Sequence, residues 1–360
     1  MDNINENIRN EAPQGETPHK RRPRYKGTHP RKFSEKYKEL NPEKYAETVE
    51  KIRQKGNTPA GMHIPIMVKE ILDFLDIQPG QQGLDATLGY GGHTTEMLKK
   101  LDHTGHIYGL DVDPIESAKT RERLEQHGFG EKDVTVTLLN FANIDQMAKK
   151  YGQFDFILAD LGVSSMQIDD PSRGFSFKRE GPLDLRLDPA HGITAAKRLK
   201  TVKFEEFKNI LIENSDEPYA DQIAREVFHR KKHHIPIETT KDLYDVVDVA
   251  LDFLPKKEKK EAVKKSCQRT FQALRIDVNH EFEVLDQFLE KLPSVLKPGG
   301  RAAILTFHSG EDRRVKKSFK EMNRAGVYSE VARNVIRPSA EECRQNTRAS
   351  CTKMRWAIKA

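Results

Sequence analysis

The sequence predicts an α/β protein built on a Rossmann-like, doubly wound parallel sheet that is interrupted by a helical domain. Three observations lead to this fold class. Strand-like apolar runs alternate with helical patterns between positions 83 and 160, as is typical of parallel sheets. A glycine-rich turn follows the first run. A long helical stretch then separates the fourth predicted strand from the fifth.

The glycine-rich turn spans residues 83–93. An apolar run ends there, and three glycines precede a helical pattern: Gly89, Gly91 and Gly92. Glycines allow positive φ angles and a close approach of the backbone to a ligand. A second strand, 106–111, ends in Asp111 about 20 residues later, the spacing at which a carboxylate meets ribose hydroxyls. The turn therefore indicates a nucleotide-like cofactor, although a purely structural turn would have the same composition.

The other elements of the first half follow from periodicity. Apolar residues at helical spacing predict a helix over 67–75. Asp113-Pro114 opens another helix that ends near position 127, because proline suits the first helical turn. The runs 134–139 and 154–159 predict the third and fourth strands.

The alternation stops after the fourth strand. Residues 161–193 have the composition of a loop, since aspartate, proline and glycine interrupt every longer element. Helical patterns fill 194–265 and indicate the inserted domain. The sheet resumes at 301–307, a basic helix is predicted at 311–322, and a strand at 354–358 is expected to close the sheet.

Composition narrows the class of protein. The chain has 360 residues and 36% apolar residues, enough for one to three domains with a sizeable core. It contains no run of eighteen apolar residues and no secretory signal pattern, so we expect a cytoplasmic protein with no membrane partner. Its three cysteines form no CxxC pair, so we expect neither a disulfide framework nor a metal site.

Residues 1–60 are expected to form a basic and flexible extension. Nine lysines and arginines between positions 20 and 38 face a single acid, Glu35. A segment this polar buries too little apolar surface to fold alone, and its charge suits contact with phosphates. A solubilising tail is the alternative interpretation.

Two cofactor classes fit the glycine loop and the three acids at strand ends, Asp85, Asp111 and Asp160. A dinucleotide and S-adenosylmethionine fit about equally well at first. The phosphate-loop pattern Gly-x4-Gly-Lys-Ser/Thr is absent from the sequence. The loop also lacks the Gly-x-Gly-x-x-Gly spacing of dehydrogenases, and carboxylates near the site favour a positively charged sulfonium.

One further stretch carries a specific resemblance. Residues 160–177 read Asp-Leu-Gly-Val-Ser-Ser-Met-Gln-Ile-Asp-Asp-Pro-Ser-Arg-Gly-Phe-Ser-Phe, and 181–189 read Gly-Pro-Leu-Asp-Leu-Arg-Leu-Asp-Pro. This sequence closely resembles the signature of the ribosomal RNA small-subunit methyltransferase H family, also called MraW. The likeness covers most of 62–360 and includes further motifs at 63–65, 91–93, 269–276 and 307–313.

The resemblance implies a class I S-adenosylmethionine-dependent methyltransferase fold with a helical domain inserted between the fourth and fifth strands. It also implies N4-methylation of a cytidine in the decoding region of 16S ribosomal RNA, with the small ribosomal subunit as partner and a possible homodimer. The expected division of the chain is a basic extension at 1–60, a first methyltransferase part at 61–168, an active-site loop with the helical substrate-binding domain at 169–285, and a second methyltransferase part at 286–360.

The family's cofactor contacts map onto Gly91, Gly92, His93, Asp111, Phe141, Asp160 and Gln167. From the residues alone, Phe141 would also suit the core, and His93 would also suit a helix start. We expect Asp160 to accept a hydrogen bond from the cytosine amine, with Ser164 and Ser165 as secondary candidates. A strand-end aspartate can instead position its loop.

RNA contacts are expected from Arg173, Phe175, Phe177, Arg269, Arg275 and His308. The residues of the 173–177 segment would bind phosphate and stack on bases, because a target base must be unstacked before it is methylated. A lid packed on the core is the other interpretation of this segment. A dehydrogenase, and a non-catalytic ribosome-assembly factor that retains the fold, remain alternative functions.

Overall fold

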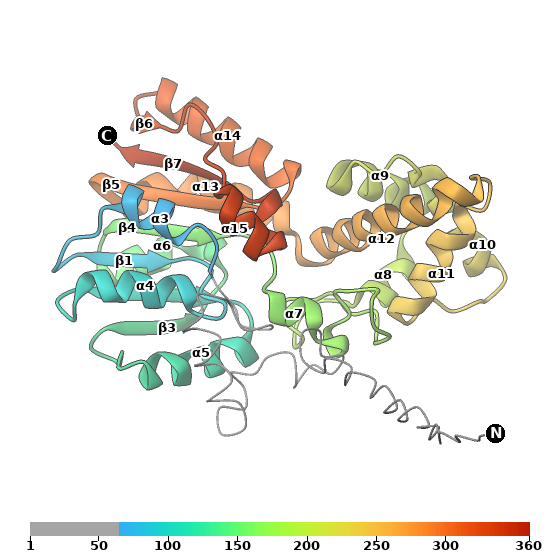
Figure 1. The fold of residues 1–360 in the computed structure, drawn as a ribbon, viewed down its shortest axis with the longest axis horizontal. Helices are drawn as coiled ribbons and strands as arrows, with labels where there is room; N and C mark the ends of the chain where they lie inside the picture. The colour runs from blue at the N-terminus through green and yellow to red at the C-terminus, as the bar shows by residue number, and fades with distance from the viewer. Residues whose placement is uncertain (1–64) are drawn as a thin grey trace, which may run out of the picture.

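A seven-stranded sheet forms one half of the molecule (Figure 1). The computed structural model describes residues 65–360, so the predicted extension 1–60 and residues 63 and 64 lie outside the described part. The strands are β1 (Gln82–Asp85), β2 (His106–Asp111), β3 (Val134–Leu138), β4 (Phe154–Asp160), β5 (Leu296–Thr306), β6 (Tyr328–Val331) and β7 (Lys353–Lys359). Their order across the sheet is β3-β2-β1-β4-β5-β7-β6.

The first five strands run parallel, and β7 pairs antiparallel with both β5 and β6. The central strand β4 is buried along most of its length, with Phe154, Phe156 and Leu158 at most 1% exposed. A strand this apolar needs cover on both faces, which parallel sheets obtain from crossover helices. The predicted doubly wound sheet is therefore confirmed.

Helices cover both faces of the sheet. One face carries α3 (Val68–Leu75), α4 (Gly92–Leu101) and α5 (Pro114–Gln126), and the other carries α6 (Asp145–Tyr151), α13 (Glu281–Val295) and α14 (Ser309–Arg324). Met97 and Leu98 belong to the buried cluster on the first face, whereas Phe288 and Phe319 belong to that on the second. The two clusters hold the sheet between the helical layers.

The interruption between β4 and β5 is helical, as predicted. Its long elements are α8 (Ala195–Thr201), α9 (Phe204–Ser215), α10 (Ala220–Lys232), α11 (Thr240–Ala250) and α12 (Lys256–Asn279). Their apolar faces enclose a third cluster, in which Phe207, Ile223 and Leu243 are fully buried. Figure 1 shows this helical group beside the sheet. The group thus has a core of its own.

Three details differ from the sequence-based expectations. The segment 161–193 contains a short helix, α7 (Ser165–Asp169), and a 3-10 turn, η3 (Pro171–Arg173). The strand at the C-terminus does not close the sheet, because β7 inserts between β5 and the unpredicted edge strand β6. Helix α12 also continues beyond the predicted end of the helical segment near position 265. In residues 65–360, no helix is both long and apolar enough to cross a membrane.

A buried ion pair fastens the C-terminal strand to the sheet's second face. Asp312 at the start of α14 accepts hydrogen bonds from Arg355 Nε (2.6 Å) and Lys353 Nζ (3.0 Å) of β7. The side chains of Asp312 and Arg355 are only 12% and 8% exposed. Although burial opposes it, hydrogen bonds from these two cations lower the pKa of Asp312.

Replacing this carboxylate is expected to destabilise the fold. Asp312→Asn leaves the buried Arg355 without a counter-charge, so we expect a loss of about 3–5 kcal/mol in the free energy of unfolding at pH 7. Because the folded-state pKa is lowered, the stabilisation exists above the ordinary aspartate pKa and is lost as pH falls through the lowered value. Urea unfolding at pH 7 and pH 3 measures both effects.

The exposed pair between Asp286 and Arg314 provides the control. Asp286→Asn should cost about 0–1 kcal/mol, because solvent screens exposed ion pairs. Equal losses in the free energy of unfolding for the two variants would contradict the claim that the buried ion pair of Asp312 stabilises the fold.

Candidate active site

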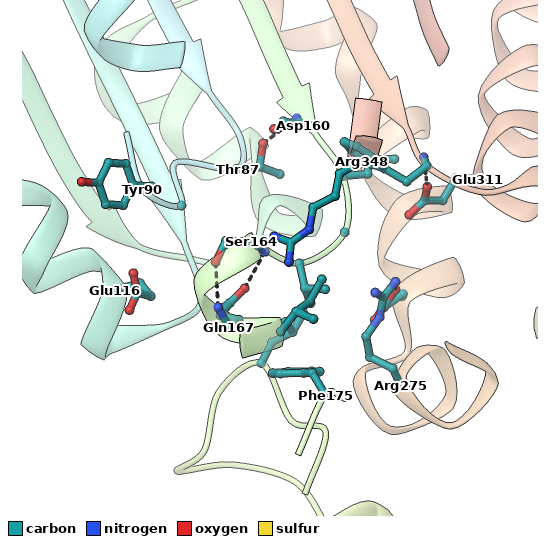
Figure 2. A pocket seen from close by; sticks show the side chains of 18 of the residues that line it. Thr87, Tyr90, Glu116, Asp160, Ser164, Gln167, Phe175, Arg275, Glu311 and Arg348 are labelled. Atoms are coloured by element: carbon teal, nitrogen blue, oxygen red, sulfur yellow. Dashed lines mark hydrogen bonds and ion pairs between the residues drawn. The ribbon is translucent and has the colours of Figure 1, made fainter. Parts of the chain in front are cut away.

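A cavity of about 820 Å³ opens where the parallel strands end (Figure 2). Its walls come from the loops after β1, β2 and β4, from α12, and from the start of α14. Ligands of doubly wound sheets bind beyond the carboxyl ends of the strands, and this cavity occupies that position. It is therefore the candidate active site.

The glycine turn forms one wall. Gly89 and Gly91 have φ angles of +48° and +80°, in the left-handed region that glycine accepts most readily. A Cβ on Gly91 would lie 2.7 Å from Thr120 Cγ2, so this position also lacks room for a side chain. Thr120 Oγ1 donates to the Gly89 carbonyl (2.5 Å) and holds the turn against α5. The sequence thus fixes a backbone surface that a ligand can approach closely.

Asp111 closes this wall at the end of β2. Its two carboxylate oxygens accept the backbone N–H groups of Gly89 and Asp113, each at 2.8 Å. Burial raises the pKa of Asp111 to about 6, although these hydrogen bonds oppose the rise. Each oxygen retains a further lone pair. The carboxylate therefore both braces the glycine turn and remains able to accept hydrogen bonds from a ligand.

A buried histidine stands between two carboxylates on the other side of the cavity. His93 is 7% exposed, and its Nε2 lies 2.9 Å from the carbonyl oxygen of Ile66. A carbonyl oxygen only accepts, so Nε2 carries a hydrogen. Nδ1 faces Asp160 Oδ2 at 3.5 Å. The contact is favourable when a proton resides on His93 Nδ1 or on the Asp160 carboxyl group. His93 also attracts the buried carboxylate of Asp85.

Asp160 keeps one oxygen unused. Its Oδ1 is buried and has no hydrogen-bond partner among residues 65–360. The pKa of Asp160 is raised to about 6, chiefly by burial; His93 opposes the rise, and Asp85 and Glu311 add to it. An unsatisfied buried acceptor is costly unless a ligand completes it. The Asp160 side chain as a whole is 25% exposed and lines the cavity, so its carboxylate can serve as a hydrogen-bond acceptor there.

The loop after β4 is tied together by one network. Ser164 and Gln167 form a capping box at the start of α7, in which Ser164 Oγ accepts the Gln167 N–H (3.2 Å). Gln167 Nε2 donates to Asp113 Oδ2 (3.0 Å), and Arg173 Nη1 donates to the same oxygen (2.6 Å). Arg173 also donates to two backbone carbonyls and is 10% exposed. Arg173 is thus positioned inside the loop, which differs from its expected contact with RNA phosphate.

The aromatic residues of the predicted site occupy separate walls. Phe141 begins the 3-10 turn η2 (Phe141–Asn143), lines the cavity and packs edge-on against Phe288 at 5.1 Å. Phe175 is buried at 9% exposure, and Phe177 packs among Tyr244 and Phe271. Both belong to or border the helical core, so the lid interpretation describes their present packing. Ser165 is the first residue of α7, and its side chain lies outside the described part.

The remaining predicted RNA contacts differ in availability. Arg269 is 39% exposed and lies 4.0 Å from Glu217. Arg275 lines the cavity, but its guanidinium binds Glu281 through two hydrogen bonds of 2.8 and 2.9 Å. His308 lines the cavity with Nε2 3.1 Å from Glu311 Oε1. Of these three, Arg269 alone is substantially exposed.

Three side chains near Arg275 have the types that bind metals. The ligand atoms of Glu281, His308 and Glu311 lie within 4.8 Å of one another. The Arg275 guanidinium already supplies a cation to Glu281. Although burial opposes it, the pKa of Glu311 is lowered, chiefly by the hydrogen bond with His308 and also by the charge of Arg275. The cluster is therefore explained by charge pairing within the protein.

Two cavity residues escaped the sequence analysis. Glu116 on α5 lines the cavity near the glycine turn, and its buried Oε2 has no hydrogen-bond partner among residues 65–360 but lies 4.0 Å from Arg123 Nη2. Arg348 belongs to the 3-10 segment η4 (Thr347–Cys351), and Figure 2 shows it reaching toward the α7 loop, where it donates to Asp169 (3.2 Å). No local motif marks either residue. Their position depends on contacts between distant parts of the chain.

The donor set suits a cation. The carboxylate residues Glu116, Asp160 and Asp111 line one cavity beside the glycine turn. Carboxylates and a cationic sulfonium attract each other, and a ribose needs acceptors such as Asp111. The residues present therefore fit S-adenosylmethionine.

Comparison with known proteins agrees with this site. The model of the MraW methylase family matches residues 60–360. The chain is 64% identical to "Ribosomal RNA small subunit methyltransferase H 1" of Lachnoclostridium phytofermentans, over 99% of each chain. It is 63% identical to the protein of the same name from Agathobacter rectalis, over 96% of this chain and 99% of the relative. A protein named "Ribosomal RNA small subunit methyltransferase H" from Koribacter versatilis is 38% identical, over 82% of this chain and 94% of the relative. The chain therefore belongs to the MraW methylase family.

Proposed function

We propose that this protein is an S-adenosylmethionine-dependent methyltransferase that modifies N4 of a cytidine in the decoding region of 16S ribosomal RNA. The names of its relatives support methylation of small-subunit ribosomal RNA. The observation that carries the choice of chemistry is the Asp160 carboxylate, which lines the cavity and has one oxygen without a hydrogen-bond partner among residues 65–360. An amine with hydrogen atoms to donate is the natural partner for such an oxygen.

The cofactor is held on the side of the glycine turn. S-adenosylmethionine supplies an electrophilic methyl group on a positively charged sulfur when it is bound. Gly91 and Gly92 offer backbone, Asp111 accepts from the ribose, and Phe141 contacts the adenine. The Ser164–Gln167 capping box positions the loop beside these residues. His93 lies beside Asp160, and its attraction favours the charged form of the carboxylate.

The target amine is oriented by Asp160. The lone pair of cytosine N4 is delocalised into the ring, which makes the amine a weak nucleophile. A carboxylate that accepts a hydrogen bond from the amine orients the nitrogen and makes its lone pair available for attack on the methyl group. The Asp160 carboxylate accepts in this scheme, and Ser164 and Ser165 are the secondary candidates. The amine proton released after transfer passes to Asp160.

The RNA enters between the sheet and the helical segment 169–285, which we propose as the substrate-binding domain. The target base must leave its stack to reach the cavity. Phe175 and Phe177 border the entrance, and Arg269 supplies an exposed cation for phosphate. The proposed partner is the small ribosomal subunit in the cytoplasm, and the proposed assembly is a homodimer.

Removing the Asp111 carboxylate should weaken cofactor binding. Asp111→Ala is expected to raise the Kd for S-adenosylmethionine about 10- to 100-fold, because a hydrogen bond to a charged group contributes roughly 1.5–3 kcal/mol. Calorimetry with S-adenosylmethionine, and with NAD in parallel, measures the effect. Asp155→Ala is the matched control, since Asp155 lies at the opposite end of β4. Unchanged affinity in Asp111→Ala, or tighter binding of NAD, would contradict the proposed cofactor site.

Neutralising Asp160 should reduce methyl transfer more than binding. We expect Asp160→Asn to lower kcat on small ribosomal subunits by about 10²- to 10³-fold, the range seen when one positioned electrostatic partner is removed. The Kd for adenosylhomocysteine should change by less than about threefold. Transfer of tritiated methyl groups and calorimetry provide the two readings. Full activity in the variant would remove Asp160 from the mechanism.

The pH dependence should report the same carboxylate. An acceptor with a pKa of about 6 loses its charge as pH falls, so kcat/KM should decline below about pH 6. His93→Gln removes the attraction that lowers this pKa, so the decline should move to higher pH. Rates from pH 5 to 9 at constant ionic strength test the shift. His103→Gln, at an exposed histidine that pairs with Asp133, should leave the profile unchanged.

A further inference from the structure

Helix α14 carries a stripe of cations on its outer face. Lys316, Lys317, Lys320 and Arg324 are all exposed, and their spacing of three and four residues places them on one side of the helix. The opposite side of α14 buries Val315 and Phe319 against the sheet. We call these four residues the α14 stripe. Glu321 is the one exposed carboxylate of this helix.

The charge of the stripe is not neutralised by the fold. No carboxylate of residues 65–360 lies within ion-pair distance of its four cations. Several other cations of the chain are paired, although Lys256, Lys257 and Lys260 at the start of α12 are not paired with any described residue. On α12, Lys259 pairs with Asp248 and Asp252, and Lys264 lies 3.8 Å from Glu261. The two arginines that precede the stripe on α14 are also paired, Arg313 with Asp216 and Arg314 with Asp286.

The stripe begins close to the active site. The first turn of α14 lines the cavity with Glu311, and His308 directly precedes the helix. Ser309 and Arg313 contact Asp216 at the end of α9, so the helical group lies across from this end of α14. Figure 1 shows α14 running from there along the outside of the sheet. A strand that leaves the cavity between the two parts can therefore continue along α14.

The chemistry of the surface favours phosphate over protein. Protein interfaces have an apolar centre and are poor in lysine. The α14 face has the reverse composition, because none of the exposed large apolar side chains of residues 65–360 belongs to this helix. Lys316 and Arg324 are eight positions apart, which spans about 12 Å at 1.5 Å per residue. That length is enough to contact several phosphates, because each strand of a duplex carries one phosphate per roughly 3.4 Å of helix axis.

We propose that the α14 stripe binds the sugar-phosphate backbone of the ribosomal RNA that flanks the target base. This inference rests on the proposed function, since it assigns a docking surface for the same substrate. It also supplies cations that the expected contacts lack, because Arg173 and Arg275 are paired inside the protein. Binding through the stripe releases counterions and therefore depends strongly on salt.

Charge reversal tests the proposal. The triple variant Lys316→Glu, Lys317→Glu, Lys320→Glu should bind small ribosomal subunits that lack the modification at least tenfold more weakly at about 0.1 M salt. The slope of log K against log salt should fall by about 2–3, since each phosphate contact contributes roughly 0.7–0.9. Affinity for adenosylhomocysteine and the Tm should stay unchanged. The triple variant with arginine at the same three positions should retain the full slope.

A matched control has the same change in charge on a distant surface. Lys99→Glu, Lys100→Glu, Lys132→Glu reverses three exposed lysines of α4 and of the turn before β3. Equal weakening by both triple variants would mean that net charge alone acts, and would overturn the proposal. So would a full slope in the α14 variant. A reduced slope on assembled subunits but not on protein-free 16S RNA would assign the stripe to a ribosomal protein and also overturn it.

The wild-type protein separates this inference from the proposed function. Methyl transfer by the wild type to the same subunits, together with an unchanged slope in the α14 variant, would reject the stripe alone. Absence of any methyl transfer by the wild type would reject the proposed function itself.

Discussion

The buried contact between His93 and Asp160 is the interaction on which the site depends. Parallel strands bring the carboxylates Asp85 and Asp160 to one edge of the sheet, where burial disfavours their charged forms. His93 lies between them, and the Ile66 carbonyl fixes its orientation. The attraction of His93 opposes the rise in pKa that burial causes for both acids. The Asp160 carboxylate lines the cavity, where it can accept a hydrogen bond, which is the property the proposed chemistry needs.

A second network links this centre to the rest of the molecule. Asp113 caps α5, and it also accepts hydrogen bonds from Gln167 and Arg173 of the loop after β4. The loop that carries Ser164 is therefore fastened to the element that follows Asp111. The cofactor side and the substrate side of the cavity share one buried carboxylate, so a substitution of Asp113 should affect both sides. This arrangement explains why Arg173 is buried rather than exposed to RNA.

Much of the fold followed from the sequence because its pattern is local. The end of the second strand at Asp111 was predicted to the residue, and β4 ends at Asp160, one residue beyond the predicted run 154–159. Helix α5 began at Pro114, as its proline and capping aspartate indicated. Strand β6 was missed because its four residues, only one of which is buried, lack a strong alternating pattern. Its pairing with β7 is a long-range contact that no local pattern encodes.

The site was predictable to the same degree and for the same reason. The glycine turn and Asp111 lie at recognisable spacing, and the structure brings both to the cavity. The roles of the cations were not predictable, because a sequence shows an arginine but not its partner. Arg275 pairs with Glu281 and Arg173 with Asp113, whereas α14 carries lysines without an ion pair to the described part of the chain, where the sequence shows only a basic helix. Arg348 enters the cavity only because η4 folds back beside α7.

The central claim is that Asp160 holds the amine of the target base. A crystal structure with adenosylhomocysteine and an RNA fragment containing the target cytidine tests it most directly. The account predicts that N4 lies within about 3.2 Å of a carboxylate oxygen of Asp160, with the ribose of the cofactor product on Asp111. A cytosine amine directed away from Asp160, toward solvent or another acceptor, would contradict it.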